Sequence, residues 1–146
     1  MEAEDIIEIL AVLRNPGGVR PIFMGGWGVD ALLTRQTRRH DDLDLIVLGY
    51  DGKRATDALA WIGFKPVHRP DASPTNFAVC DDIGRMVDLH VAEDGMYGGV
   101  SVWAEQRRGN VAGVPVICLS RSAQITLHKV YPMRLKDELD MDLLNK

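Results

Sequence analysis

The stretch GGWGVDALLTRQTRRHDDLDLIV, residues 25–47, constrains the fold more than any other part of this 146-residue chain. It opens with a glycine pair and ends in an apolar run, and arginines and closely spaced aspartates lie between them. A solvated loop would tolerate these charges, but it would not need the ordered segments on either side. The stretch therefore predicts a tight strand-to-helix turn, followed by a buried strand that carries carboxylates at its start.

The aspartates of this stretch have the spacing of residues that share one face of a strand. Side chains alternate along a strand, so Asp42 and Asp44 point one way, in phase with His40, while Asp41 points the other way. Two carboxylates on one face repel each other unless a cation lies between them, and aspartate is a poor strand former. Oxygen ligands suit Mg²⁺ or Mn²⁺. The triplet leaves open a plainer alternative, in which these aspartates are turn, cap and edge residues.

A second segment, RMVDLHV at residues 85–91, has a similar alternation. Its valines and leucine form an apolar face, and Asp88 and His90 share the opposite face. If this strand lies beside the first one, Asp88 completes a set of three carboxylates, as a two-metal phosphoryl-transfer site requires. An isolated Asp-x-His is more often a surface pair, so this prediction depends on the combination of the two strands.

The glycines have two possible interpretations. Residues 26–31 fit the pattern GxGxxA, and Asp44 follows at about the distance expected of a dinucleotide-binding motif. In that motif, however, the acidic residue follows the second strand, whereas here the aspartates precede the apolar run. Gly25 and Gly26 are better explained as a tight turn that offers backbone N–H groups to a phosphate. Arg38 lies in a cationic segment whose guanidinium groups match phosphate oxygens, although a solvated loop is the alternative.

Hydrophobic periodicity and turn residues predict an α+β fold, with a mixed sheet and helices mainly on one face. Helices are expected over 3–14, 27–33, 54–62, from a Ser120 cap to about Tyr131, and over 135–144. Strands are expected at 21–24, 44–48, 64–68, 76–80, 85–91 and 114–119. The region 93–113 is the least regular and is expected to form a mobile loop. Trp27 and Trp61 are expected to anchor the core.

Composition limits the classes of function. A net charge of -4 and a pI near 5.5 argue against a binder of duplex nucleic acid. No apolar run approaches the ~20 residues of a membrane span, and the acidic start MEAEDIIEIL is unlike a signal peptide. Cys80 and Cys118 lack metal-ligand spacing and are expected to be reduced thiols of a cytoplasmic protein. No linker interrupts the chain, so residues 1–146 are expected to form a single domain.

The order of these motifs resembles that of the nucleotidyltransferase superfamily related to DNA polymerase β. More closely, residues 25–45 are similar to the small antibiotic nucleotidyltransferases that adenylylate lincosamides and the aminoglycoside 2''-hydroxyl. In that group a glycine pair, an Arg-x-His and an Asp-x-Asp recur in this order, and the later Asp88 strand, residues 128–131 and the last helix also match. The likeness runs from about residue 20 to 144. The segments 65–80 and 93–113 carry no matching motif, and acceptor choice is expected to depend on them.

The resemblance implies a polymerase-β-like nucleotidyltransferase fold and an enzyme that transfers a nucleoside monophosphate, AMP from Mg-ATP, to a hydroxyl of a small molecule. An antibiotic, either a lincosamide or an aminoglycoside, is the usual acceptor in this group, whose members confer antibiotic resistance. The resemblance also implies that Asp42 and Asp44 bind Mg²⁺ (or Mn²⁺). Asp88 would ligate the second metal ion or take the proton from the attacking hydroxyl.

The same resemblance implies that Gly25, Gly26, Arg38 and His40 bind the nucleoside triphosphate. Small members of this group tend to pair, so a homodimer is expected. Nucleic acid and membranes are not expected as partners. The alternative is a non-catalytic nucleotide-binding or toxin–antitoxin-type member of the same fold, which the presence of all three aspartates disfavours. An unrelated metal-dependent phosphohydrolase would require more histidine ligands than this chain offers.

Overall fold

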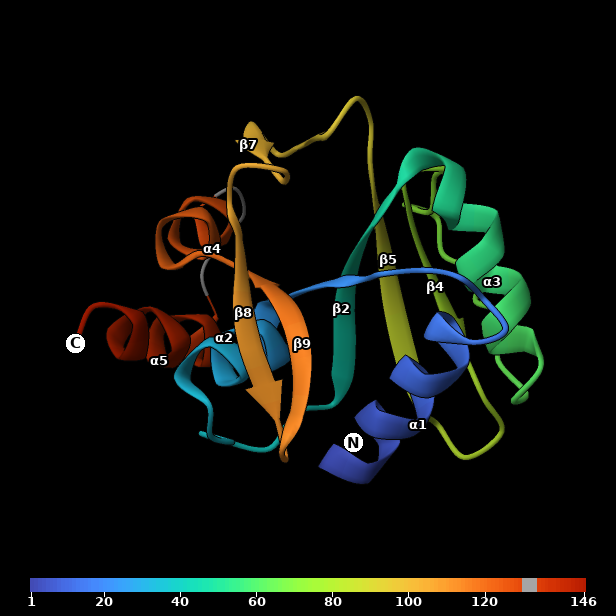
Figure 1. Ribbon diagram of the computed structural model, residues 1–146, viewed down its shortest axis with the longest axis horizontal. Helices are drawn as coiled ribbons and strands as arrows, with labels where there is room; N and C mark the ends of the chain where they lie inside the picture. The colour runs from blue at the N-terminus through green and yellow to red at the C-terminus, as the bar shows by residue number, and fades with distance from the viewer. Residues whose placement is uncertain (130–133) are drawn as a thin grey trace.

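A mixed sheet forms the centre of the computed structural model, which describes residues 1–129 and 134–146 (Figure 1). Within these residues the sheet has seven strands in the order β3-β4-β5-β2-β1-β9-β8. The pairs β2–β5 and β1–β9 are parallel, and the other neighbours are antiparallel. The strands are β1 (Ile22–Met24), β2 (Asp42–Leu48), β3 (Lys65–Pro66), β4 (Asn76–Cys80), β5 (Met86–Ala92), β8 (Gln106–Val111) and β9 (Val114–Leu119).

The helices lie around this sheet, with α1 and α3 together on one side and α4 and α5 near β8 and β9 in Figure 1. Ser120 caps α4, because its hydroxyl accepts a hydrogen bond from the backbone N–H of Ala123. A short 3-10 turn, η1 (Gly49–Asp51), leads from β2 into α3. The helices are α1 (Ala3–Arg14), α2 (Gly25–Leu33), α3 (Gly52–Ala60), α4 (Arg121–His128) and α5 (Leu135–Leu144).

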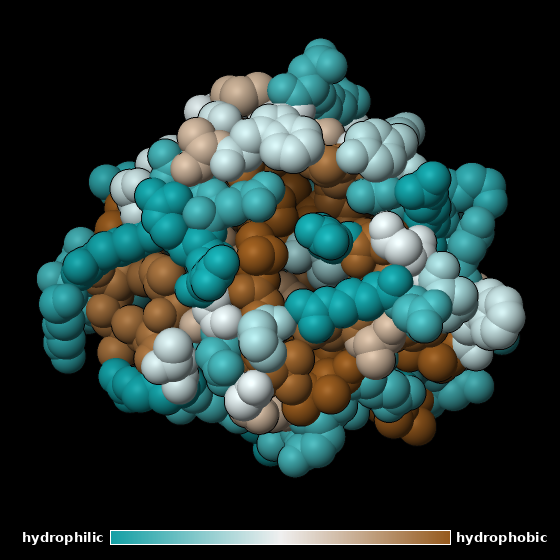
Figure 2. Space-filling model, viewed as in Figure 1, coloured by the Kyte–Doolittle hydropathy of each residue, from teal (hydrophilic) through white to brown (hydrophobic). Residues whose placement is uncertain are grey.

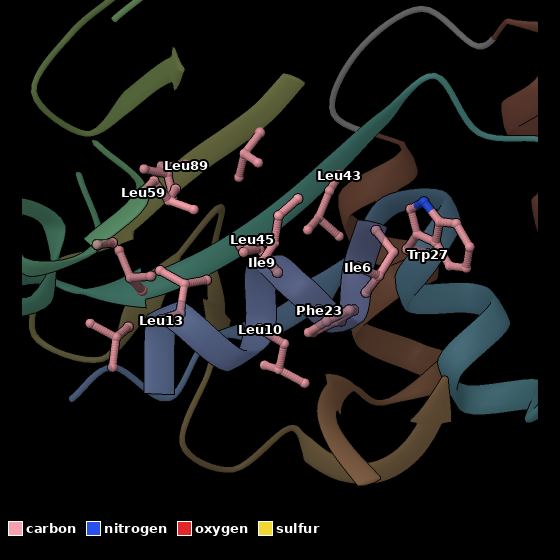
Figure 3. Packing of buried hydrophobic residues seen from close by; sticks show 14 of the residues in the cluster. Ile6, Ile9, Leu10, Leu13, Phe23, Trp27, Leu43, Leu45, Leu59 and Leu89 are labelled. Atoms are coloured by element: carbon pink, nitrogen blue, oxygen red, sulfur yellow. The ribbon is translucent and has the colours of Figure 1, made fainter. Parts of the chain in front are cut away.

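The larger core lies between α1, α2, α3 and one face of the sheet, as Figure 3 shows. Leu43 and Leu45 of β2 are fully buried there, so the aspartates of β2 face the other side of the sheet. A smaller core on that other side includes Ile46 of β2 and Leu127 of α4. This smaller core packs α4 against the sheet. Each large apolar side chain buried in this way contributes about 1.5–3 kcal/mol, so the alternation of β2 is strongly specified.

The predicted elements 3–14, 76–80, 114–119 and 135–144 have the bounds that the structure shows, and the predicted α+β class is confirmed. The prediction of a mobile loop over 93–113 was wrong. This region contains β6 (Met96–Tyr97), β7 (Val100–Ser101) and the whole of β8. The sequence of β8, QRRGNV, lacks apolar alternation because β8 is an edge strand with exposed arginines at 107 and 108.

Two other expectations require correction. Trp61 is 78% exposed, because α3 ends at Ala60 and Trp61 lies in the turn that follows, whereas Phe64 is buried beyond it. The predicted strand 64–68 is reduced to the two residues of β3. The predicted helix from Ser120 ends at His128 in the structure, and its expected last residues, 130 and 131, lie outside the described residues. Trp27 is buried in the larger core as predicted.

The surface of the molecule combines hydrophilic and hydrophobic areas on the face shown in Figure 2. Polar side chains dominate the rim of this view, and hydrophobic surface is visible in the middle and on the side where α4 and α5 lie in Figure 1. Leu135 and Leu139 of α5 are exposed and are four residues apart, so they lie on one face of the helix. Across the described residues, every helix is too short or too polar to cross a membrane.

Candidate active site

The structure brings the carboxylates of the two acidic strands together. β2 and β5 are parallel neighbours, and Asp44 lies directly opposite Asp88 in their register. Asp42 is two residues before Asp44 on the same face, opposite Met86. All three aspartates line one open cavity of about 630 Å³. The carboxylates therefore share a single wall, at the start of both strands.

Two of the three carboxylates have a cationic or polar partner. His90 of β5 bonds to Asp44 Oδ1 through Nε2 at 3.1 Å, and its Nδ1 lies 2.7 Å from the Tyr97 hydroxyl. A carboxylate only accepts hydrogen bonds, so His90 Nε2 donates to Asp44. Arg69 Nη1 donates to Asp88 Oδ1 at 2.8 Å. Arg69 and Tyr97 lie in segments without a recognisable motif, so neither contact could be predicted from the sequence.

The electrostatics of this wall favour a bound cation. Burial raises the pKa of Asp42, and the negative charges of Asp44 and Asp88 raise it further. The pKa of Asp88 is also raised, first by burial and then by Asp44, although Arg69 and His90 oppose the shift. A divalent cation between the carboxylates would remove this repulsion.

The donor set fits Mg²⁺ or Mn²⁺ in its chemistry, since it consists of carboxylate oxygens on one wall. However, no three His, Cys, Asp or Glu side chains within residues 1–129 and 134–146 already converge as a ligand group. Asp44 is in contact with His90, and Asp88 is in contact with Arg69. A metal ion at this wall would compete with those two partners.

The glycine pair lies directly against this wall, at the start of α2. Gly25 has a φ of +64°, and a Cβ there would collide with Asp44 Oδ2. A Cβ on Gly26 would collide with His40 Nδ1 and would lie 2.8 Å from Arg38 Nη2. Both positions therefore require glycine, and the backbone of the turn lies beside the predicted nucleotide-binding residues.

His40 lies just before β2 rather than within it, and it is buried. Its Nε2 is 2.5 Å from Asp30 Oδ2, and Thr37 donates to the other oxygen of Asp30. The ring also packs against Trp27, with 4.8 Å between the ring centroids. Nδ1 of His40 is buried without a hydrogen-bond partner and faces the Gly26 turn. His40 thus fixes α2 against the start of β2.

Arg38 forms a bidentate ion pair with Asp140 of α5. Its Nε and Nη2 donate to the two oxygens of Asp140 at 3.0 and 2.9 Å, and Asp140 is 1% exposed. His128 Nε2 lies 3.9 Å from the same carboxylate. Burial alone would raise the pKa of Asp140, but the hydrogen bonds and charges of His128 and Arg38 lower it. This network fastens α5 to the cavity, and only the fold reveals it.

We expect Asp140→Asn to destabilise the protein by about 3–5 kcal/mol, because it leaves the partly buried cation of Arg38 and the ring of His128 without their shared anion. Chemical denaturation measures the change. The matched control is Asp142→Asn, an exposed position on the same helix, which should change stability by less than about 0.5 kcal/mol. Equal stability of the two variants would show that the ion pair does not hold α5 in place.

The fold of this chain is that of known nucleotidyltransferases. The lincomycin-bound structure of the lincosamide antibiotic adenylyltransferase LnuA superposes on this chain with a TM-score of 0.81, over 98% of this chain and 96% of that chain. The two sequences are 22% identical, so this comparison establishes the shared fold. The antibiotic-resistance factor ANT(2'')-Ia has a TM-score of 0.79 and 25% identity, over 97% of this chain and 81% of that chain. The polymerase-β-like fold expected from the sequence is therefore confirmed.

The chain belongs to the aminoglycoside-2''-adenylyltransferase family, whose model matches residues 5–144. A lincosamide resistance protein of Staphylococcus haemolyticus is 27% identical over 129 residues, which cover 80% of this chain and 78% of that protein. The chain thus belongs to a family of antibiotic adenylyltransferases, as the resemblance of its motifs implied. The family match favours an enzyme over the non-catalytic alternative.

Proposed function

We propose that this protein transfers AMP from ATP to a hydroxyl group of a lincosamide or aminoglycoside antibiotic, with a divalent metal ion as cofactor. The observation that carries the proposal is the position of Asp44 opposite Asp88, with Asp42 on the same wall and the glycine turn beside them. In-line transfer of a nucleotidyl group needs anionic metal ligands, a base and a phosphate-binding turn within one cavity.

The metal-binding roles fall to Asp42 and Asp44. Their carboxylates would hold Mg²⁺ or Mn²⁺, and Asp88 would be a ligand of a second ion or the proton acceptor. When bound, the metal would neutralise charge on the triphosphate and on the departing pyrophosphate. The raised pKa of Asp42 supports this assignment, because it reflects burial first and then repulsion from Asp44 and Asp88, and a cation would relieve that repulsion.

The triphosphate would lie along the glycine turn. Gly25 and Gly26 are at the beginning of α2, where backbone N–H groups and the helix dipole favour an anion. Arg38 and His40 border the same turn, and the Asp140 ion pair orients the Arg38 guanidinium toward the cavity. Arg38 has N–H groups beyond those bonded to Asp140, and these can donate to phosphate oxygens.

Asp88 would act on the acceptor. Its Oδ1 is bonded to Arg69, and its second oxygen can accept the proton of the attacking hydroxyl. As that proton leaves, the hydroxyl oxygen forms a bond to the α-phosphorus and the bond to pyrophosphate breaks. Burial and the charge of Asp44 raise the pKa of Asp88, which makes its carboxylate a stronger base.

The test of this proposal is the metal dependence of nucleotide binding. We expect ATP to bind in the presence of magnesium and to bind at least about a hundredfold more weakly in EDTA, since the carboxylate wall repels a bare triphosphate. Isothermal calorimetry measures both affinities, and pyrophosphate release with a panel of antibiotics identifies the acceptor. Equal ATP affinity in magnesium and in EDTA would contradict the assignment of Asp42 and Asp44.

A homodimer is also part of the proposal, with a small-molecule acceptor and without nucleic acid. The cavity is open to solvent on one side of a small domain, and the exposed Leu135 and Leu139 of α5 give a second copy an apolar surface to cover. Light scattering at micromolar concentration should give twice the 16.2 kDa mass of the chain. A monomeric mass would contradict the dimer without affecting the proposed chemistry.

A further inference from the structure

Outside the proposed metal ligands, most carboxylates of the cavity are paired with arginine. Asp140 is bonded to Arg38, and Asp137 is bonded to Arg134 at 3.1 Å. Asp88, the proposed base, is bonded to Arg69. A further cavity aspartate, at position 71, also lies within ion-pair distance of Arg69. Among the described residues, Asp41 is the one further carboxylate of the cavity, and it is exposed to solvent, so little other negative charge remains for an acceptor to contact once a metal and a nucleotide occupy the site.

Arg69 lies in the cavity beside Asp88, the proposed base. It belongs to the loop between β3 and β4, and its Nη1 is 2.8 Å from Asp88 Oδ1. Its Nε is 3.6 Å from Asp71 Oδ1, and this nitrogen is buried without a hydrogen bond to any residue that the structure describes. The side chain is 26% exposed. One guanidinium thus bridges two carboxylates beside the atom that would receive the proton of the acceptor.

Beside Asp44 and His90, the wall around Asp88 includes three uncharged side chains. Asn76 of β4, Met86 of β5 and Tyr97 of β6 line the cavity there. An amide, a thioether and a phenol can contact sugar hydroxyls and apolar rings, but they do not attract ammonium groups strongly. A polycation binds a protein through unpaired carboxylates, so this wall is better matched to an acceptor of low charge.

We propose that Arg69 determines acceptor selectivity, admitting hydroxyl acceptors that carry at most one positive charge and disfavouring polycations. This inference rests on the proposed function, because it assumes that the acceptor hydroxyl approaches Asp88. Arg69 offsets one of the two negative charges of Asp88 and Asp71, and its guanidinium repels ammonium groups while its remaining N–H groups donate to neutral oxygens. Removal of the guanidinium would expose both carboxylates to the acceptor.

The experiment compares the binding of two acceptors of different charge. Lincomycin, with one basic amine, and tobramycin, with several, are titrated by calorimetry into the protein with magnesium and a non-reactive ATP analogue. We expect the parent to bind lincomycin more tightly, and Arg69→Gln to shift the ratio of affinities toward tobramycin by about tenfold, the effect of one charge at roughly 6 Å. Arg69→Lys, which keeps the charge, should remain within about threefold of the parent ratio.

The matched control is Arg108→Gln, an exposed position on β8 far from the cavity lining, which removes the same charge and should leave the ratio unchanged. Circular dichroism checks that each variant is folded. Tighter binding of tobramycin by the parent, no binding of either acceptor by any variant, or an unchanged ratio in Arg69→Gln would overturn the proposal. Titration of the ATP analogue tests the proposed function separately, so failure of nucleotide binding is distinguishable from failure of acceptor selection.

Discussion

Replacing Asp42 or Asp44 with asparagine is expected to abolish adenylyl transfer and to weaken magnesium-dependent ATP binding at the same time. The amide oxygen is neutral and is a poor ligand of Mg²⁺, so either substitution should remove the metal and the triphosphate together. The rate should fall below the detection limit, a loss of at least about 10³-fold. Pyrophosphate release and calorimetry with ATP and magnesium measure the two effects.

The control for this pair is Asp41→Asn. Asp41 is adjacent to Asp42 but lies before β2 and is exposed, so most of the activity should remain. If Asp41→Asn is inactive while Asp42→Asn is active, the functional side chains lie on the face of the strand that carries Asp41, not on the face that carries Asp42 and Asp44. Parent-like rates in all three variants would mean that the aspartates have only a structural role.

Asp88→Asn should separate binding from chemistry. If Asp88 acts mainly as the base, the variant should bind Mg-ATP within a few fold of the parent while transfer slows by about 10²–10⁴-fold. The amide oxygen of asparagine can still accept the hydrogen bond from Arg69, so the loop that holds this arginine should stay in place. Single-turnover measurements with saturating ATP report the chemical step directly.

Asp82→Asn serves as its control, because Asp82 is exposed in the turn before β5 and lies outside the cavity lining. Its rate should match that of the parent. If Asp88→Asn instead loses ATP affinity as strongly as Asp44→Asn, then Asp88 belongs with the metal ligands and another group must take the proton. If the rate is unchanged, transfer does not depend on a base at this position.

Local sequence determined the elements that carry the site. The alternation of leucine and aspartate in residues 42–45 is a property of the strand itself, so burial of Leu43 and Leu45 turns both aspartates to the other face. The glycine pair predicted a tight turn from the same local rules, and the structure leaves no room for a Cβ at Gly25. The family resemblance rests on these short motifs, and the match over residues 5–144 agrees with it.

Tertiary structure alone decided which segments meet. The position of Asp88 opposite Asp44 depends on a parallel pairing of two strands whose facing residues are 44 positions apart in the chain, and single-strand periodicity does not specify a neighbour. Edge strand β8 had no apolar alternation to predict it, because an edge strand exposes polar side chains to solvent.

The hydrogen-bond partners of the site residues also could not be predicted from local sequence. Arg69 meets Asp88, Tyr97 meets His90, and Asp140 meets Arg38 across 102 residues. Long polar side chains reach several ångströms from their backbone, so their contacts depend on which loops and helices the whole fold brings to the cavity. The sequence determined which residue types could bind a metal and a phosphate, and the packing of the chain decided which charges remain unpaired for a substrate.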